Sequence, residues 1–381
     1  MNYIDRKIEA ELRSRLFSGK AIIVYGPRQS GKTTMIKHLV EGDASEALWL
    51  NGDSPDIREV LAGVTVTKWK AIIGKKRIVV IDEAQRIDNI GLAMKLVVDE
   101  LPDIQLIATG SSAFELADRT SEPLTGRKFE YHLLPLSFAE LCEYHGLLEE
   151  KRSLEQRLLF GSYPEIISNP SDAPALLSML AGSYLYKDLL MLENIKKPQL
   201  LDKLIRALAL QIGSEVSSNE LSRLIGADVK TIDKYIDLLE KSYVVFTLPA
   251  FSRNARVEIR KSRKIFFYDL GIRNAVLGNF IHPDSRTDIG GLWENYLIVE
   301  RLKLNGNQPF PPRHYFWRTA EKNEVDYLEE STVLSAWEFK WNKKASVKIP
   351  AAFTNAYPQA VTGLISPTNY DDFLMPTVQS R

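Results

Sequence analysis

Short apolar runs alternate with segments of helical periodicity along the first third of the chain. The runs that suit buried strands lie at residues 21–25, 47–50, 77–81 and 105–109, and polar or glycine residues follow each of them. A parallel sheet with crossover helices produces this alternation, because its strands are covered on both faces. The pattern therefore predicts an α/β fold with a parallel-sheet core in this part of the chain.

The pattern changes further along. From about residue 130 to residue 212 it is mostly helical, and beyond that point short helices give way to strands rich in aromatic residues. The first ten residues mix charges of both signs at helical spacing and predict an amphipathic first helix. Because 381 residues exceed what one hydrophobic core usually organises, we expect two or three domains.

The sequence Gly-Pro-Arg-Gln-Ser-Gly-Lys-Thr occupies residues 26–33, directly after the first predicted strand and before a helical pattern. A phosphate-binding loop needs glycines for close backbone approach, a lysine for the β- and γ-phosphate oxygens, and a hydroxyl for magnesium. The segment therefore predicts ATP bound with Mg²⁺, with Thr33 as a magnesium ligand. We expect the nucleotide to be held by Gly26, Pro27, Arg28, Gln29, Ser30, Gly31, Lys32, Thr33 and Thr34, together with Ser111.

Two carboxylates, Asp82 and Glu83, follow the third predicted strand. Adjacent acids suit two tasks: we expect Asp82 to hold the magnesium shell and Glu83 to polarise the water that attacks the γ-phosphate. The next strand ends in Thr109, Ser111 and Ser112. Because this edge borders the γ-phosphate, one of these hydroxyls either orients the attacking water or caps the following turn.

Further along, Arg127 follows a glycine. An arginine here suits neutralisation of γ-phosphate charge in the transition state, either within the chain or from a neighbouring subunit of a homo-oligomer. A surface salt bridge is the alternative interpretation.

Residues 217–246 have the pattern of a helix-turn-helix. Ser217 and Glu220 match a capping box, Gly226 ends the first helix, and Asp228 is placed to cap the second. Predicted strands at residues 243–248 and 264–268 would form a wing, and the segment 252–264 between them carries six basic residues and one acid. This arrangement suits phosphate contacts on double-stranded DNA, and it equally suits a protein-interaction module with a solvated basic hairpin.

Several acidic and basic residues between positions 294 and 340 have a spacing that would bring their side chains together in a folded domain. Residues 337–341 alternate aromatic and charged residues, so a strand there points Glu338 and Lys340 to one face. Asp326 lies on the preceding predicted strand and Glu294 on an upstream amphipathic helix. Two or three carboxylates with a lysine suit a metal-dependent nuclease, in which Glu294, Asp326 and Glu338 hold Mg²⁺. A cross-strand salt-bridge cluster is the alternative.

Composition narrows the class of protein. With 49 basic and 49 acidic residues, the chain has no overall field for nucleic acid, so any such binding must come from a local patch. The single cysteine, Cys142, excludes an intrachain disulfide, and no apolar stretch is long enough to span a bilayer. We therefore expect a cytoplasmic protein without a membrane partner.

Together these motifs resemble a prokaryotic family of AAA-type P-loop ATPases whose C-terminal region is a DUF4143-type domain of unknown function. The resemblance covers nearly the whole chain. It depends on the motifs at residues 26–33, 81–85, 109–112, 126–127, 161–165, 293–295, 324–326 and 338–340. Ser162 departs from the family, where a second glycine is usual.

The resemblance implies three regions: an AAA-type ATPase domain at residues 1–165, a helical and winged-helix region at 166–250, and a nuclease-like domain at 251–381. The last would be an α+β domain of the PD-(D/E)xK, or restriction-endonuclease-like, type. Asp326, Glu338 and Lys340 match its D, E and K positions as catalytic residues, and Glu294 matches its helix acid. The expected function is a Mg²⁺-dependent ATPase that acts on DNA, with a metal-dependent nuclease module. The alternative is an ATP-controlled switch whose C-terminal module binds a protein.

Overall fold

The computed structural model describes residues 3–110, 123–182, 198–252, 263–306, 308, 310–342, 344 and 349–375. The chain forms two compact units. The first consists of residues Met1–Pro135 and Lys241–Tyr243, and the second of Leu136–Glu240 and Val244–Arg381. Among the described residues, no helix combines the length and apolar character that crossing a bilayer requires.

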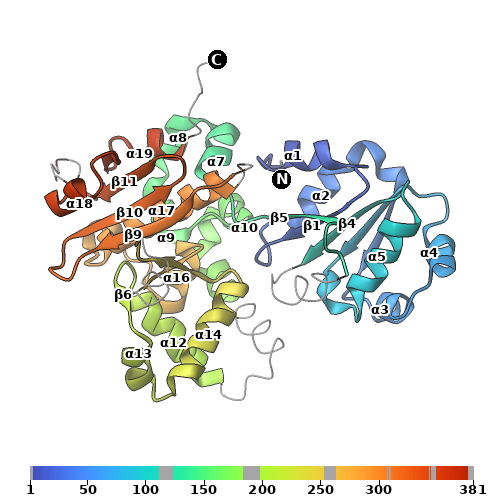
Figure 1. Ribbon diagram of the computed structural model, residues 1–381, viewed down its shortest axis with the longest axis horizontal. Helices are drawn as coiled ribbons and strands as arrows, with labels where there is room; N and C mark the ends of the chain where they lie inside the picture. The colour runs from blue at the N-terminus through green and yellow to red at the C-terminus, as the bar shows by residue number, and fades with distance from the viewer. Residues whose placement is uncertain are drawn as a thin grey trace. The chain divides into compact units, whose positions relative to one another are not determined.

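A five-stranded parallel sheet lies at the centre of the first unit (Figure 1), with the strand order β2-β3-β4-β1-β5. The strands are β1 (Ala21–Tyr25), β2 (Ala47–Asn51), β3 (Ile78–Asp82), β4 (Gln105–Gly110) and β5 (Lys128–His132). The first four confirm the predicted apolar runs. The fifth was missed because it is a partly exposed edge strand without an apolar run.

The sheet order brings distant parts of the sequence together. Strand β4 pairs with β1 on one side and with β3 on the other. Since all strands are parallel, the segments that follow β1, β3 and β4 emerge at one edge of the sheet. This edge therefore receives the phosphate-loop motif, the Asp82–Glu83 pair and Thr109.

Helices and short 3₁₀ turns complete the first unit. They are α1 (Glu9–Arg15), α2 (Lys32–Leu39), η1 (Glu41–Glu46), α3 (Pro55–Leu61), α4 (Val66–Ile73), η2 (Ala84–Arg86) and α5 (Ile90–Glu100). Met35 and Ile36 of α2 are buried with Ile22 and Val24 of β1, which seats α2 on the sheet. The predicted first helix is displaced: residues 3–8 are not helical, and α1 begins at Glu9.

Helices predominate in the first part of the second unit. They are α7 (Phe138–His145), α8 (Leu147–Arg152), α9 (Leu154–Phe160), α10 (Pro164–Ser168), η3 (Pro170–Asp172), α12 (Pro198–Leu210), α13 (Ser218–Ile225) and α14 (Val229–Lys241). Ser217 accepts a hydrogen bond from Glu220 N at the start of α13, and Gly226 ends that helix with φ 77°. Asp228 accepts from Thr231 N at 2.9 Å, which caps α14.

An antiparallel three-stranded sheet follows these helices, in the order β6-β8-β7. Its strands are β6 (Glu215–Val216), β7 (Val245–Pro249) and β8 (Arg263–Phe267). The two predicted wing strands thus exist within a few residues of their expected positions. Most of the basic segment between them, residues 253–262, lies outside the described residues.

A mixed four-stranded sheet forms the last part of the second unit, in the order β12-β11-β10-β9. The strands are β9 (Arg313–Arg318), β10 (Glu324–Glu330), β11 (Leu334–Phe339) and β12 (Val361–Ile365). The helices of this part are α16 (Leu270–Leu277), η4 (Pro283–Ser285), α17 (Ile289–Gly306), α18 (Ala351–Ala356) and α19 (Tyr370–Leu374). Trp293 of α17 is buried with Tyr327, Phe339 and Tyr370, so an aromatic core joins helix and sheet. The second unit therefore combines a helical region with a mixed α+β domain.

Two buried arginines meet one carboxylate between α16 and α17. Arg273 and Arg286 both contact Asp288, with Arg273 Nη1 to Asp288 Oδ2 at 2.7 Å and Arg286 Nε to Asp288 Oδ1 at 2.8 Å. Burial by itself would raise the pKa of Asp288, but these partners lower it to about 2. The carboxylate therefore stabilises the fold in its ionised form.

We predict that Asp288→Asn lowers the free energy of unfolding by about 2 kcal/mol at pH 7, because two buried guanidinium groups lose their counter-charge. The stabilisation from a depressed pKa is complete above the unfolded value of about 4 and is lost as the pH falls towards about 2. The difference between variant and wild type should shrink over that range. Urea unfolding at several pH values measures it, and exposed Asp284→Asn is the control, expected to change stability by less than about 0.5 kcal/mol. An equal effect of both variants would contradict the prediction.

Candidate nucleotide site and C-terminal carboxylate cluster

The loop at residues 26–33 connects β1 to α2 and approaches its neighbours closely. A Cβ at Gly26 would lie 2.1 Å from Leu133 O, so only glycine fits there. Gly31 has φ 94° and directly precedes α2, which begins at Lys32. The backbone thus turns sharply and presents the N-terminal end of α2 to the loop, where a helix favours an anion.

The lysine of this motif is held by the loop itself. Lys32 Nζ donates hydrogen bonds to Gly26 O and Pro27 O, each at 2.8 Å, and the side chain is buried. Within the described part of the chain, the buried Ser30 hydroxyl has no hydrogen-bond partner. An ammonium group and a buried hydroxyl in a loop at a helix N-terminus fit a phosphate ligand.

Asp82, the last residue of β3, accepts hydrogen bonds from Thr33 of α2 and from Thr109 of β4. Thr33 Oγ1 donates to Asp82 Oδ2 at 2.9 Å, and Thr109 Oγ1 donates to Asp82 Oδ1. Thr109 Oγ1 also accepts a hydrogen bond from Glu83 N at 3.1 Å. A hydroxyl beside a carboxylate is the donor set that Mg²⁺ uses next to nucleotide phosphates, so these residues fit the ion.

Glu83 lies in a constrained turn directly after β3. Its φ of 49° and ψ of 44° fall in the left-handed region, which is uncommon for glutamate. Gln85 Nε2 donates to Glu83 Oε2 at 2.5 Å, which orients the carboxylate. A Cβ at Gly52 would lie 2.4 Å from Glu83 O, so the turn is also closely packed by the residue after β2. Backbone strain held in this way is typical of functional positions.

Arg127 is not brought to this site in its own chain. It precedes β5, and Arg127 O accepts from Ala21 N at the beginning of β1, whereas the phosphate loop follows the end of β1. Five residues of strand separate the two edges by about 17 Å. Arg127 Nε instead donates to Asp99 Oδ1 at 2.5 Å. The geometry therefore opposes the expected role within the chain, and the role from a neighbouring subunit stays a prediction.

Ser111 and Ser112, the other predicted hydroxyls, lie outside the described residues. Of the three hydroxyl residues, Thr109 is the one that the structure places beside Asp82 and Glu83.

Arg6 contacts the phosphate loop and was not anticipated from the sequence. Its Nη1 donates to Ser30 O at 2.8 Å and its Nη2 donates to Leu134 O at 2.6 Å. The side chain is only 7% exposed, although it comes from the mixed-charge segment before α1. Nothing in the local pattern distinguishes it from the exposed Arg13, because its partners are 24 and 128 residues away.

A second polar cluster lies in the mixed sheet of the second unit. Lys340 Nζ donates to Glu338 Oε2 at 3.0 Å and lies 3.7 Å from Asp326 Oδ2. Asp326 Oδ2 accepts from Phe339 N at 2.8 Å. Burial and the nearby Asp326 charge raise the pKa of Glu338 to about 7. Neighbouring strands thus bring these three predicted residues together.

Glu294, the fourth predicted residue of this cluster, is engaged by a buried lysine. Lys264 Nζ contacts Glu294 Oε1 at 2.8 Å and Glu324 Oε1 at 2.6 Å. Burial raises the pKa of Glu294 to about 8, with the Lys264 charge opposing this shift and the Asp326 charge adding to it. Lys264 and Glu324 were missed as members of the cluster, since their proximity follows from the packing of two sheets against α17.

Comparison with known families agrees with this organisation. Residues 18–142 match the family described as "AAA domain", residues 151–281 match "Domain of unknown function (DUF8612)", and residues 289–374 match "Domain of unknown function (DUF4143)". The chain therefore contains an AAA-type P-loop domain, and matches to two domains of unknown function follow it. The resemblance inferred from the motifs is confirmed, and an AAA domain implies nucleotide binding.

Two curated relatives and one solved structure are similar to the chain. The uncharacterized protein Rv2008c of Mycobacterium tuberculosis is 28% identical over 351 residues, which span 90% of this chain and 75% of the relative. An uncharacterized protein of Haemophilus influenzae is 23% identical over 306 residues, or 74% of each chain. The Walker-type ATPase PABY2304 of Pyrococcus abyssi has a TM-score of 0.49 at 16% identity and covers 72% of this chain and 96% of its own.

We predict that Arg6→Met weakens ATP binding by about tenfold. The Ser30 carbonyl in the loop would lose a hydrogen bond from a charged donor, and such a bond contributes about 1.5 kcal/mol. Titration with a fluorescent ATP analogue in the presence of Mg²⁺ measures the affinity. Arg13→Met is the matched control, since Arg13 is an exposed residue of the neighbouring helix α1. Affinities that agree for wild type, Arg6→Met and Arg13→Met would show that Arg6 does not position the loop.

Proposed function

We propose that this protein binds ATP together with Mg²⁺ and hydrolyses it. The observation that carries the proposal is the hydrogen-bond network through which Asp82 joins Thr33 and Thr109. A network of this kind prepares a magnesium site next to a phosphate loop before any ligand arrives.

Each residue of the site has a distinct task in this proposal. Lys32 binds β- and γ-phosphate oxygens, while Thr33 and Asp82 hold the magnesium ion that bridges those phosphates. Glu83 accepts a hydrogen bond from the attacking water and so orients it towards the γ-phosphate. Thr109 fixes the positions of the Asp82 carboxylate and the Glu83 backbone, because its hydroxyl forms hydrogen bonds with both. The proposed site therefore draws its residues from α2, from the end of β3 and from β4.

Hydrolysis is measured best with two variants. We predict that Lys32→Ala weakens ATP binding by about 100-fold, because it removes a buried ammonium group. Glu83→Gln should keep ATP binding but lower turnover by at least about 100-fold, the usual contribution of a general base. Phosphate release and nucleotide binding, assayed side by side, separate the two effects. Normal turnover by Glu83→Gln would remove Glu83 from its proposed role.

We further propose that ATP turnover is coupled to double-stranded DNA through the region of α13, α14, β7 and β8. Two capped helices joined at Gly226 and followed by an antiparallel strand pair support a winged-helix interpretation. Lys230 and Lys234 are exposed on α14, and residues 253–262 add four basic residues and one acid. Exposed acids also occur on α14, among them Asp233, which pairs with Arg263. The local charge is therefore mixed on the helix and basic in the following segment.

Stimulation by DNA provides the test of this coupling. Wild-type phosphate release should rise in the presence of duplex DNA at low salt, and Lys32→Ala should show no release with or without it. If DNA leaves both turnover and gel mobility unchanged, the protein-switch alternative is favoured.

The mixed sheet supports a second candidate function, a metal-dependent nuclease. Asp326 and Glu338 lie on paired strands with Lys340 beside them, as a one-metal phosphodiesterase site requires. An ion-pair cluster that only stabilises a protein-binding module would contain the same contacts.

Replacement of two carboxylates separates these alternatives. We predict that the double variant Asp326→Ala/Glu338→Ala loses Mg²⁺-dependent DNA cleavage and keeps its ATP turnover. Glu330→Ala, a partly exposed acid on the same strand β10, is the control and should cleave as the wild type does. Absence of cleavage by wild type, with ATP turnover intact, would instead support the switch.

A further inference from the structure

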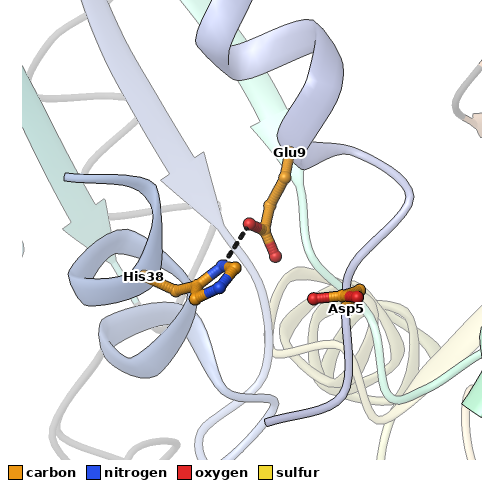
Figure 2. A group of neighbouring side chains, drawn as sticks. All are labelled: Asp5, Glu9 and His38. Atoms are coloured by element: carbon orange, nitrogen blue, oxygen red, sulfur yellow. Dashed lines mark hydrogen bonds and ion pairs between the residues drawn. The ribbon is translucent and has the colours of Figure 1, made fainter. Parts of the chain in front are cut away.

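Three metal-ligating side chains meet in the first unit outside the nucleotide site. Asp5 comes from the segment before α1, Glu9 from the start of α1 and His38 from the last turn of α2 (Figure 2). One ligand atom from each residue lies within 4.8 Å of the others. Figure 2 shows Asp5 and Glu9, from the N-terminal segment and the start of α1, near His38 of α2.

Two of these side chains are held in place by their neighbours. Glu9 Oε1 accepts hydrogen bonds from the Tyr3 hydroxyl and from Arg6 N, the latter at 3.1 Å. Its second oxygen, Oε2, thereby faces His38 Nδ1 at 2.7 Å. The Tyr3 ring packs on the His38 ring with 4.2 Å between centroids, which restrains the imidazole. Outer contacts that orient a carboxylate and an imidazole are typical of metal sites.

A hydrogen bond between Glu9 and His38 accounts for only part of this arrangement. It leaves unexplained why the exposed carboxylate of Asp5 lies within reach of the same two atoms. An ion at the centre would be attracted by both carboxylates. It would have access from solvent, because the His38 side chain is 37% exposed while Glu9 is 11% exposed.

We propose that Asp5, Glu9 and His38 bind a divalent transition-metal ion of the Zn²⁺ class. The ligands are a carboxylate oxygen of Asp5, Glu9 Oε2 and His38 Nδ1, and water supplies the remaining position. An imidazole nitrogen among the donors favours zinc over magnesium or calcium, which prefer oxygen ligands alone. Binding requires Nδ1 without its proton, so that proton leaves to solvent or the ring adopts the Nε2–H tautomer.

The site joins two segments that serve the phosphate loop. Arg6, which contacts Ser30 O, lies between Asp5 and Glu9 in the sequence, and α2 begins at Lys32. An ion would therefore tie the N-terminal segment to the phosphate-loop helix. Metal binding itself does not depend on the proposed ATPase activity.

Calorimetric titration of the full chain with Zn²⁺, without nucleotide, tests the proposal. The titration uses the Asp326→Ala/Glu338→Ala background, so that these two carboxylates contribute nothing to the signal. In that background, Asp5→Asn and His38→Gln should each weaken zinc affinity by at least about tenfold. At equal concentration, zinc should also raise the thermal midpoint of the background protein by more than that of either variant. Asp5→Asn changes an exposed side chain, so it gives a result even if His38→Gln impairs folding.

His282→Gln is the matched control. His282 also has two carboxylate neighbours, but Glu155 lies at its Nε2 at 3.0 Å and Asp284 at its Nδ1 at 3.7 Å. The two carboxylates lie at different nitrogens of the His282 ring. One ion bound to either nitrogen would therefore not contact both of them. Zinc affinity should therefore be unchanged in this variant. Absence of zinc binding by the background protein, or equal affinity in Asp5→Asn, would overturn the proposal.

Discussion

The candidate nucleotide site depends on the parallel pairing of β4 with both β1 and β3. This pairing places Thr33, Asp82 and Thr109 at one sheet edge, where a single carboxylate accepts hydrogen bonds from two hydroxyls. Strands buried on both faces cannot slip in register without exposing apolar side chains or unpairing backbone groups. The positions of the three polar residues are therefore set by the burial of the sheet.

Buried cations play a comparable part in the second unit. Lys303 Nζ donates to Leu136 O, Ser162 Oγ and Glu300 Oε1 within 3.0 Å. Ser162 thus supplies an acceptor, and its backbone N–H donates to Asp269 Oδ2 at 2.8 Å. A charge in such a site is tolerated only when its partners are present, so each contact favours one arrangement of helices and turns. The same reasoning applies to Lys264 between Glu294 and Glu324.

Local motifs and long-range contacts differed in how well the sequence predicted them. The four apolar strands, the phosphate loop, the Asp82–Glu83 pair and the caps of α13 and α14 depend on neighbouring residues, and the sequence pattern located them. Strand β5 was missed, because an edge strand needs no continuous apolar run. Arg6 and Lys264 were missed because charged residues are usually exposed, and only their distant partners make burial acceptable. The sequence left two roles open for Arg127, and the structure pairs it with Asp99 at the sheet edge opposite the phosphate loop.

By itself, the sequence determined the class of the first domain and located the loop in which phosphate binding is expected. It could do so because backbone curvature, helix initiation and phosphate chemistry act over a few consecutive residues. The tertiary structure decided which distant groups meet: Arg6 at the loop, His38 beside Glu9, and Lys264 between two glutamates. These contacts join residues 24 to 60 positions apart, and strand order and helix packing alone bring such residues within hydrogen-bond distance.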